Sequence, residues 1–561
     1  MERPWLKHYE PTVPPNLTYP EYPLHVNLEE SARKHPNVVA TIFHDAKLTY
    51  AQLNALADKL AAALQNLGVQ KGDRVAIYIA NTPQYVISYY GALKAGAIVV
   101  PINTLYAPRE VQYQVNNSGA ETIIVMSNFY KAVKSIRANT GLKRVIVTSV
   151  KEYLPPLIRL LFTLFKEKKE GHYADISGDA DTYWFQDLIQ KAPDKPKKVE
   201  VSPEDIACLL YTGGTTGVPK GAELTHRNLM ANAIQCKHWI TDATEAQEAV
   251  LVALPLFHSY GMTTCMNFGI QQAATLVLIP NPRDIPDILK NIDKHKPTLF
   301  PGVPTMYVAL NNHPETPKYN LRSIRACISG AAGLPVEVQT KFQELTGARL
   351  VEGYGLTEAS PVTHANPIYG ENRIGTIGLP WPDTDARIVD LETGQKDMPP
   401  GEIGELVVKG PQVMRGYWNM PEETANQLRN GWLYTGDIAK MDADGYFSIV
   451  DRKKDMIIAG GFNIYPREVE EVLYEHPKVK EAVVAGIPDP YRGETVKAYI
   501  LLKEGETATA EEIIEYCKGK MAKFKVPTLV EFRTELPKTM VGKILRRILV
   551  EEEKAKLAKG Q

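Results

Sequence analysis

The stretch from Tyr211 to Gly221 has the composition of a polyphosphate-binding loop. It holds four glycines, three threonines and one lysine in eleven residues. Glycine lets backbone N–H groups approach a ligand closely. The hydroxyls of Thr212, Thr215 and Thr216 and the charge of Lys220 add donors for anionic oxygens. A proline precedes the lysine and a glycine follows it, so the stretch is not the common P-loop, in which a Ser or Thr follows the lysine.

The flanks of this glycine loop favour a binding role over a plain surface loop. An apolar run at 206–211 is typical of a buried strand, and residues 228–233 indicate a helix. A glycine loop between a strand and a helix is a common place for a bound phosphate. We therefore expect a nucleotide site here.

Further downstream, two segments could complete such a site. Residues 328–333 are small, so a flat group could lie against their backbone, and residues 352–358 bring Tyr354, Thr357 and Glu358 together. A carboxylate such as Glu358 suits a hard cation like Mg²⁺. Without a binding role, Tyr354 would simply pack in the core and Glu358 would be a surface carboxylate. The glycine loop upstream argues against both alternatives.

His258 lies in an apolar segment, Leu254–Gly261, and an uncharged run follows at 262–278. A lone histidine among apolar residues is more often a core residue than a catalyst. The run itself fits either a buried core or the apolar lining of a pocket for a fatty tail. Both interpretations of the run stay open at the level of the sequence.

The C-terminal part changes character near Asp451. A charged segment, residues 451–455, follows a motif that contains Asp437, and Lys543 lies on a glycine-containing loop near the end of the chain. Taken alone, both segments are typical of solvated turns. We place a domain boundary at Asp451, which predicts an N-terminal domain of residues 1–450 and a smaller C-terminal domain of residues 451–561.

The elements that must position these residues follow from the apolar spacing. Thr49 and Gln52 form a capping box, and leucines then recur at helical spacing up to Gly68. Strands are expected at 75–79, 98–102 and 122–125. Nearly continuous apolar strands that alternate with helices predict an α/β fold, with parallel sheets covered by helices in a large multi-layer N-terminal domain. The short strands and single helix beyond Asp451 predict a small α+β domain.

Composition narrows the class of protein. At 561 residues the chain is longer than a domain with a single hydrophobic core usually is, so two or more domains are expected. The net charge of −1 gives no excess of positive charge for binding nucleic acid. Five scattered cysteines, no secretory leader and no long apolar run predict a cytoplasmic protein. The apolar segment 154–165 fits either a membrane-surface helix or a packed amphipathic excursion. Its shortness favours the packed excursion.

Six motifs in this order resemble the core motifs of the adenylate-forming superfamily, which includes acyl-CoA synthetases. They are 211–221, 352–358, 434–437, 451–455, 460–466 and 537–546. The segment 430–456 also resembles the signature of fatty-acyl-CoA synthetases. The resemblance implies a large N-terminal domain joined by a hinge at Asp451 to a small mobile C-terminal domain. It further implies ATP, Mg²⁺ and coenzyme A as ligands.

The resemblance assigns a role to each position. Thr212, Thr215, Thr216 and Lys220 would contact the ATP phosphates, and Glu358 with Thr215 would hold Mg²⁺. Adenine would stack on Tyr354 beside Gly330 and Ala331, with Thr357 near the α-phosphate. Asp437 and Arg452 would hold the ribose hydroxyls, and Lys543 would contact the reacting carboxylate. Gly460 and Gly461 would border the pantetheine arm of coenzyme A. His258 would lie near the reacting carbonyl.

The activity that follows is ligation of a long-chain fatty acid to coenzyme A through an acyl-adenylate, with release of AMP and pyrophosphate. Alternatives are a medium-chain or aryl-acid CoA ligase, an enzyme that passes its acyl group to a carrier protein, and a silent nucleotide-binding scaffold. Relatives of the family suggest a homodimer. The apolar segment 154–165 adds peripheral contact with the inner face of a membrane as a further hypothesis.

Overall fold

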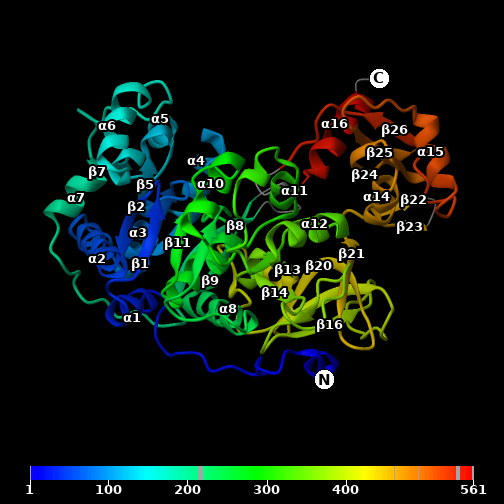
Figure 1. Cartoon of the computed structure of the whole chain (residues 1–561), viewed down its shortest axis with the longest axis horizontal. Helices are drawn as coiled ribbons and strands as arrows, with labels where there is room; N and C mark the ends of the chain where they lie inside the picture. The colour runs from blue at the N-terminus through cyan, green and yellow to red at the C-terminus, as the bar shows by residue number, and fades with distance from the viewer. Residues whose placement is uncertain (1, 213–218, 460–461, 490–491, 539–543, 559–561) are drawn as a thin grey trace. The chain divides into compact units, whose positions relative to one another are not determined.

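The protein folds into two compact units. The first comprises residues 1–385 and 409–433, and the second comprises 386–408 and 434–561. The predicted boundary at Asp451 falls inside the second unit. The computed structural model, drawn in Figure 1, describes residues 2–212, 219–459, 462–489, 492–538 and 544–558.

The largest sheet of the first unit has eight strands within the described residues. Their order across the sheet is β18 (Gly416–Tyr417), β9 (Lys220–Thr225), β8 (Ile206–Thr212), β4 (Ile98–Pro101), β3 (Arg74–Tyr78), β5 (Thr122–Met126), β6 (Arg144–Thr148) and β7 (Thr182–Trp184). The pairs from β8 to β7 are all parallel, whereas β8–β9 and β9–β18 are antiparallel. The predicted parallel sheet is therefore confirmed, with an antiparallel extension on one edge.

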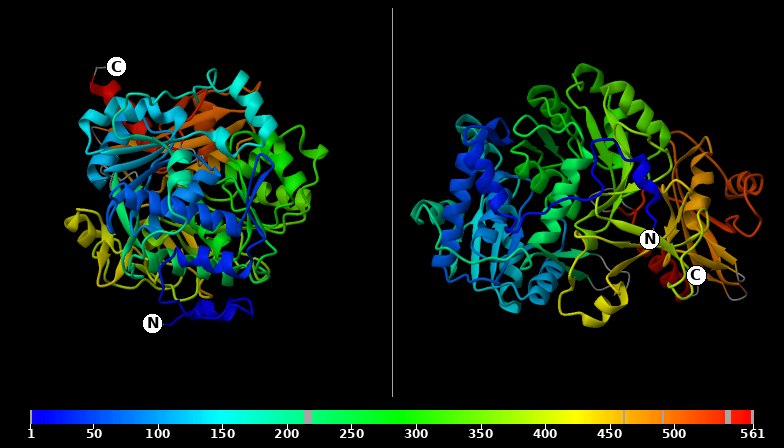
Figure 2. Two further views of the ribbon diagram at one scale, coloured as in Figure 1. Left: turned by 90° about the vertical axis from the view of Figure 1, so that its left-hand side faces the viewer. Right: turned by 90° about the horizontal axis from the view of Figure 1, so that it is seen from below.

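Helices cover both faces of this sheet. On β3, Ala76 and Tyr78 belong to an apolar cluster with residues of α4 (Pro108–Ser118) and α5 (Tyr130–Ile136). Successive strand residues point to opposite faces, so Val75 and Ile77, which are also fully buried, point to the other face. There α2 (Tyr50–Asn66) packs against α3 (Pro83–Lys94) and α7 (Phe185–Lys191), as Figure 2 shows for the blue helices.

Helix α2 forms where the sequence predicts it. The hydroxyl of Thr49 accepts from the Gln52 backbone N–H at 3.3 Å, and the Gln52 amide oxygen accepts from the Thr49 N–H at 2.9 Å. This capping box satisfies two backbone donors that the first turn leaves unpaired. The leucines at helical spacing then turn toward the core, where Leu53, Leu60 and Leu64 are fully buried.

The described residues of the first unit also form two smaller sheets. One has the order β10 (Ala249–Val252), β11 (Thr275–Leu278), β1 (Val39–Phe43) and β2 (Ala46–Thr49). The other has the order β12 (Ala326–Ser329), β13 (Arg349–Gly355), β14 (Val362–Ala365) and β15 (Leu379–Pro380). Strands β12 and β13 are parallel, so their carboxyl ends meet at one edge of the sheet.

The run 262–278 belongs to the buried core along most of its length. It forms a π-helical turn (Gly261–Asn267), helix α9 (Phe268–Gln271) and strand β11. A Cβ on Gly269 would lie 2.5 Å from a methyl carbon of Leu276 in β11. The core interpretation therefore holds at Gly269, because a neighbouring side chain fills the space that its Cβ would face.

The segment before β7 departs from the expected packing. Helix α6 (Pro156–Phe165) contains no buried residue, and six of its large apolar side chains are exposed. The favoured prediction of a packed amphipathic excursion is therefore wrong. The short helix α6 has too few neighbouring elements to cover its apolar side chains.

The second unit has an α+β architecture, as predicted. Strands β16 (Asp385–Val389), β17 (Gly404–Lys409), β20 (Trp432–Met441) and β21 (Phe447–Arg452) pair in that order. Its other sheet has the order β23 (Phe462–Ile464), β22 (Ile457–Ala459), β25 (Gly493–Leu502) and β24 (Val479–Asp489), with β26 (Leu529–Phe532) on β25. Helices α14 (Pro466–Tyr474) and α15 (Ala510–Lys518) cover one face, and α16 (Arg546–Ala558) packs on the other.

No described helix in either unit combines the length and the apolar character that crossing a membrane would require.

Candidate functional site

The glycine loop joins two strands, not a strand and a helix. Strand β8 ends at Thr212 and strand β9 begins at Lys220, and these two residues lie opposite each other in an antiparallel ladder. The predicted strand–loop–helix arrangement is therefore wrong, because Lys220–Thr225 pairs with β8 before α8 (His226–Trp239) begins. Thr215 and Thr216 lie outside the described residues. The structure thus places Thr212 and Lys220 side by side at the base of the loop.

Helix α4 holds both stems of this hairpin. The hydroxyl of Tyr211 donates to the side-chain oxygen of Asn117 at 2.7 Å. On the other stem, the hydroxyl of Tyr113 donates to the backbone oxygen of Pro219 at 3.0 Å. Two hydrogen bonds from one helix therefore fix where the loop leaves and re-enters the sheet.

Lys220 is buried and contacts two residues that the sequence analysis did not select. Its ammonium group forms an ion pair with Glu423 of α13 (Pro421–Gln427). The same nitrogen lies 5.2 Å from the ring centre of Tyr417, a distance typical of a cation–π contact. Tyr417 is in place because β18 pairs with β9, with Tyr417 opposite Ala222.

Tyr417 also contacts the predicted metal ligand. Its hydroxyl donates to Glu358 Oε1 at 2.7 Å. Burial, together with the negative charge of Glu358, raises the pKa of Tyr417 far above its usual value, so the hydroxyl stays protonated and donates. One tyrosine thus joins the phosphate-side lysine to the predicted Mg²⁺ carboxylate.

Glu358 fits a magnesium ion that is held mainly by a nucleotide. It lies in a short 3₁₀ turn, Thr357–Ala359, whose Glu358 backbone oxygen accepts from the Met414 N–H at 2.7 Å. The part of the chain that the structure describes contains no cluster of three or more metal-ligating side chains. A single carboxylate suits Mg²⁺, which usually takes one or two protein carboxylates together with substrate phosphates and water.

The predicted adenine-binding residues share one edge of the β12–β13 sheet. Gly330 and Ala331 follow the carboxyl end of β12, and Tyr354 lies at the same end of β13. A Cβ on Gly330 would come within 3.0 Å of the Tyr260 ring, so only glycine fits there without a shift. The carboxyl ends of adjacent parallel strands are a common place for a nucleotide.

The His258 segment lies beside the same turn. The Ser259 and Thr357 hydroxyl oxygens are 3.4 Å apart, and His258 Nδ1 accepts from the Tyr260 N–H at 3.2 Å. His258 is half-buried. The structure therefore brings His258, Thr357 and Glu358 into one part of the first unit, as their predicted roles require.

Two predicted ribose ligands meet in the second unit. Asp437 of β20 lies opposite Arg452 of β21, and Arg452 Nε is 3.4 Å from the Asp437 carboxylate. Gly460, Gly461 and Lys543 lie outside the described residues. The contact between Asp437 and Arg452 agrees with their shared assignment, which stays a prediction.

Asp451 is the second-last residue of the same strand and is buried. Its carboxylate accepts from the backbone N–H groups of Arg452 at 2.6 Å and Arg467 at 2.8 Å. Burial raises the pKa of Asp451 to about 6. The side chain thus ties β21 to the start of α14, and its role as a hinge stays a prediction.

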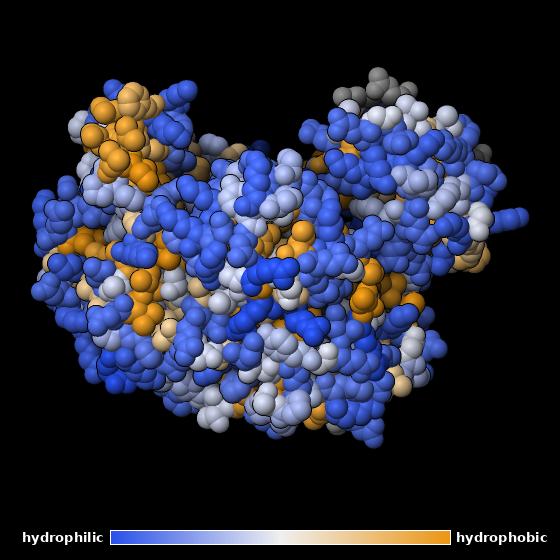
Figure 3. Space-filling model, in the orientation of Figure 1, coloured by the Kyte–Doolittle hydropathy of each residue, from blue (hydrophilic) through white to orange (hydrophobic). Residues whose placement is uncertain are grey.

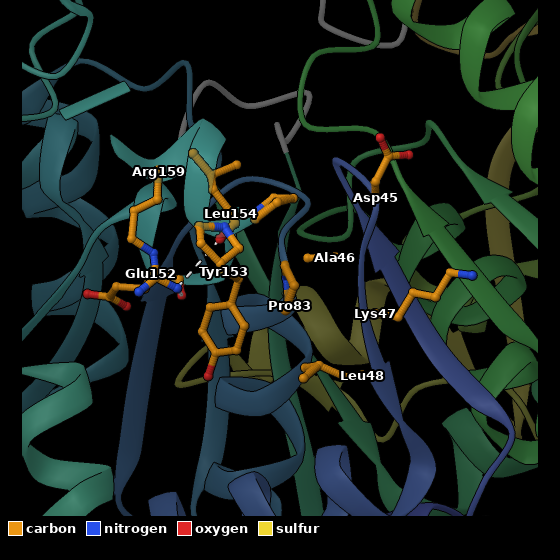
Figure 4. Close-up of a pocket in the computed structure, with 11 residues that line it drawn as sticks. Asp45, Ala46, Lys47, Leu48, Pro83, Glu152, Tyr153, Leu154 and Arg159 are labelled. Carbon is orange, nitrogen blue, oxygen red and sulfur yellow. Dashed lines mark hydrogen bonds between the residues drawn. The ribbon is translucent and has the colours of Figure 1, made fainter. Parts of the chain in front are cut away.

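Two of the pockets that the described residues form lie in the first unit. A pocket of about 410 Å³ includes Met414, which contacts the Glu358 turn through its backbone. Another, of about 310 Å³, lies between the β1–β2 turn and the segment that leads into α6 (Figure 4). None of the predicted site residues lines this second pocket, so the pocket is separate from the candidate site.

Family models match most of the chain. Residues 28–418 match the AMP-binding enzyme family, and residues 468–543 match the AMP-binding enzyme C-terminal domain. The chain belongs to the AMP-binding enzyme family.

Named relatives agree with this membership. A long-chain-fatty-acid–CoA ligase of Bacillus subtilis is 50% identical over 554 residues, which cover 98% of each chain. The crystal structure of the anthranilate CoA ligase AuaEII in complex with anthranoyl-AMP matches with a TM-score of 0.83 at 30% identity, over 97% of this chain and 99% of that one. ATP-bound MatB from Rhodopseudomonas palustris matches with a TM-score of 0.83 at 30% identity, over 95% and 99%. The predicted resemblance and the predicted fold class are confirmed.

Sequence reasoning missed Tyr417 and Glu423. A signal was present, since Pro421 followed by two glutamates is typical of the first turn of a helix. That pattern predicts α13 but not its neighbours. The pairing of β18 with β9 is a long-range contact, and it brings Tyr417 to Lys220.

Proposed function

We propose that this AMP-binding enzyme ligates a long-chain fatty acid to coenzyme A, with ATP as the energy source and AMP and pyrophosphate as products. The observation that carries the proposal is the 50% identity to a long-chain-fatty-acid–CoA ligase over 98% of both chains. The contacts of Tyr417 with Lys220 and Glu358 support it, because they gather phosphate-binding and metal-binding groups in one place.

In the first half-reaction, a carboxylate oxygen of the fatty acid attacks the α-phosphorus of ATP. The bond to the bridging oxygen breaks, pyrophosphate leaves and an acyl-adenylate forms. Both reactants are anionic, so cationic groups and oriented donors must offset the charge. Lys220 and the glycine loop would bind the phosphates, and Lys543 would lie at the carboxylate. Mg²⁺, held by Glu358 with Thr215, would supply further positive charge on the phosphates.

In the second half-reaction, the coenzyme A sulfur attacks the acyl carbonyl carbon. The thiol proton is lost, the bond between the carbonyl carbon and the AMP oxygen breaks, and the thioester forms. AMP is a good leaving group, so positioning of the thiol can supply most of the rate. We assign Gly460 and Gly461 to the pantetheine arm on the basis of their motif, and we assign no general base.

A pyrophosphate-release assay across saturated acids from about C4 to C20 tests this proposal. Long chains are expected to be preferred, because each buried CH₂ contributes roughly 0.8 kcal/mol. If pyrophosphate release is fastest with medium-chain or aryl acids, the substrate is an acid of that class and not a long-chain fatty acid. Adenylate formation without transfer to coenzyme A would indicate a carrier protein as acceptor, and no pyrophosphate with any acid would indicate a scaffold.

Two partner assignments complete the proposal. We propose a homodimer on the basis of the family resemblance alone. Peripheral contact with a membrane fits a protein whose substrate is a lipid, and α6 offers a surface for it.

A further inference from the structure

Helix α6 carries an unusually apolar exposed surface. Six of its side chains are between 41% and 69% exposed, namely Leu157, Ile158, Leu160, Leu161, Leu164 and Phe165. Figure 3 shows these apolar side chains gathered on a projection of the first unit, at the upper left of the view. A contiguous apolar patch on the surface of a protein usually marks a site of interaction.

The two faces of the helix are inverted relative to an ordinary surface helix. Arg159 and Thr163 lie one turn apart on the polar side, and Arg159 donates to the backbone oxygen of Glu152 at 2.9 Å. Figure 4 shows Arg159 directed toward Glu152. The guanidinium of Arg159 therefore reaches back to the chain while the six apolar side chains face solvent, whereas a surface helix normally buries its apolar side.

Contacts at the ends of α6 hold it in this position. Glu167, just beyond the last turn, is buried and forms an ion pair with Lys151 at 2.6 Å. The ring of Phe162 packs edge-on against His172, with ring centres 5.5 Å apart. The exposed apolar side chains are thus not needed to keep the helix in place.

The charge around the helix is positive. Residues 156–170 contain four basic and two acidic side chains, whereas the whole chain has a net charge of −1. Both acidic side chains are in ion pairs, Glu167 with Lys151 and Glu170 with Lys166. A basic segment beside an apolar helix is complementary to a surface of anionic lipid headgroups.

We propose that α6 inserts its apolar face into the surface of an anionic lipid bilayer. A helix of ten residues is about 15 Å long, which is too short to span a bilayer but suits a position in its interface. A second copy of the chain fits less well. The basic side chains beside the helix would face their own copies across such an interface, and opposed like charges weaken association.

This inference rests on the proposed function in one respect. Long-chain fatty acids partition into bilayers, so an interfacial helix would hold the enzyme where its substrate is concentrated. Binding to lipid requires no catalysis, and it can therefore be measured separately.

Vesicle flotation without ATP, coenzyme A or fatty acid tests the proposal. Wild-type protein should float with vesicles of equal parts phosphatidylcholine and phosphatidylglycerol, and less with phosphatidylcholine alone or at high salt. The triple variant Leu157→Gln/Leu161→Gln/Leu164→Gln should bind the anionic vesicles at least tenfold more weakly. The double variant Lys168→Gln/Lys169→Gln should lose most of the preference for the anionic lipid.

The matched control changes three equally exposed aliphatic residues elsewhere in the first unit. Leu105, Val336 and Ile374 are 50% to 55% exposed, and their replacement by glutamine should leave vesicle binding within twofold of wild type. Equal binding by the α6 triple variant would overturn the proposal. A dimer that sediments in the absence of lipid and dissociates in that variant would also overturn it, in favour of an interface between copies.

Ligase activity on an acid held in detergent solution separates the two proposals. The α6 triple variant should keep this activity within twofold, because it changes only the surface. Absence of ligase activity in wild type would refute the proposed function and leave the flotation result standing.

Discussion

At the scale of single residues, Tyr417 joins the lysine assigned to the ATP phosphates and the glutamate assigned to Mg²⁺. The residue types of the glycine loop, Glu358 and Tyr354 were recognisable, and the structure brings Lys220 and Glu358 to the two sides of Tyr417. Tyr417 itself carries no local signature. Its role depends on strand pairing across the chain, which the spacing of neighbouring residues cannot reveal.

Replacement of Glu358 by alanine should abolish adenylation. The change removes the carboxylate assigned to Mg²⁺, and it leaves the backbone contact with Met414 in place. We expect pyrophosphate release to fall at least a hundredfold with little change in the melting temperature. Glu337→Ala, an exposed glutamate at the start of α12 (Val336–Thr346), is the control. Full activity of the Glu358 variant at saturating Mg²⁺ would refute the assignment.

Tyr417→Phe should weaken adenylation without abolishing it. The variant keeps the ring under Lys220 and loses the hydrogen bond to Glu358, which at about 1.5–3 kcal/mol for a charged acceptor corresponds to roughly 10- to 150-fold. The loss should appear mainly as a higher Mg²⁺ concentration for half-maximal pyrophosphate release.

A matched tyrosine elsewhere controls for loss of a hydroxyl–carboxylate pair. Tyr369 donates to Asp242 at 2.6 Å on the surface, and Tyr369→Phe should leave the Mg²⁺ dependence unchanged. An equal shift in both variants would show that Tyr417 acts only through general stability.

At the scale of elements, local signals predicted helices better than connections. The capping box and the leucine spacing predicted α2 to within two residues. The hairpin of β8 and β9 was missed, because alternation along Lys220–Thr225 is short and the glycine loop hides its pairing with β8. The exposure of α6 belongs to the less favoured of the two interpretations, since an apolar pattern cannot show whether other elements cover it.

The buried run 262–278 leads to a prediction about stability. A tryptophan at Gly269 would collide with Leu276, which packs in β11, and overpacking of a core costs about 1–3 kcal/mol or more. We expect Gly269→Trp to lower the melting temperature clearly and to reduce activity equally on acids of every length.

Gly141→Trp is the control, because a Cβ there meets no atom within 4 Å. It should leave both the melting temperature and the chain-length profile near wild type. A stable Gly269 variant that selectively loses long acids would instead place this part of the run against the acyl chain.

At the scale of the whole molecule, the sequence predicted two parts with different architectures, and the structure confirms both. Residues 386–408 belong with the second unit, although they precede Asp451 by a wide margin. The sequence could not show this, because β17 joins that unit by pairing with β20, and β16 joins it by pairing with β17. Long-range pairing therefore sets the composition of the units, as it sets the position of Tyr417.

The two half-reactions make different demands on the C-terminal part. Adenylation needs a cation at the junction of carboxylate and α-phosphate, which is the role assigned to Lys543. Thioester formation would need the segment 460–466 at the thiol, which is the role that the family motif assigns to it. The two segments would have to reach the same reaction centre in turn, so we predict that the C-terminal domain turns about Asp451 between the steps.

Lys543→Ala separates these demands. The variant should form acyl-adenylate from ATP and acid at least a hundredfold more slowly, because the positive charge at the junction is lost. It should make thioester from supplied acyl-adenylate and coenzyme A at close to the wild-type rate. Lys538→Ala is the control within the same motif, since Lys538 pairs with Glu481 at 2.6 Å in the second unit, and both rates should stay near wild type. Equal losses in both half-reactions for Lys543→Ala would contradict the two-position account, because a lysine that serves only the first step cannot slow the second.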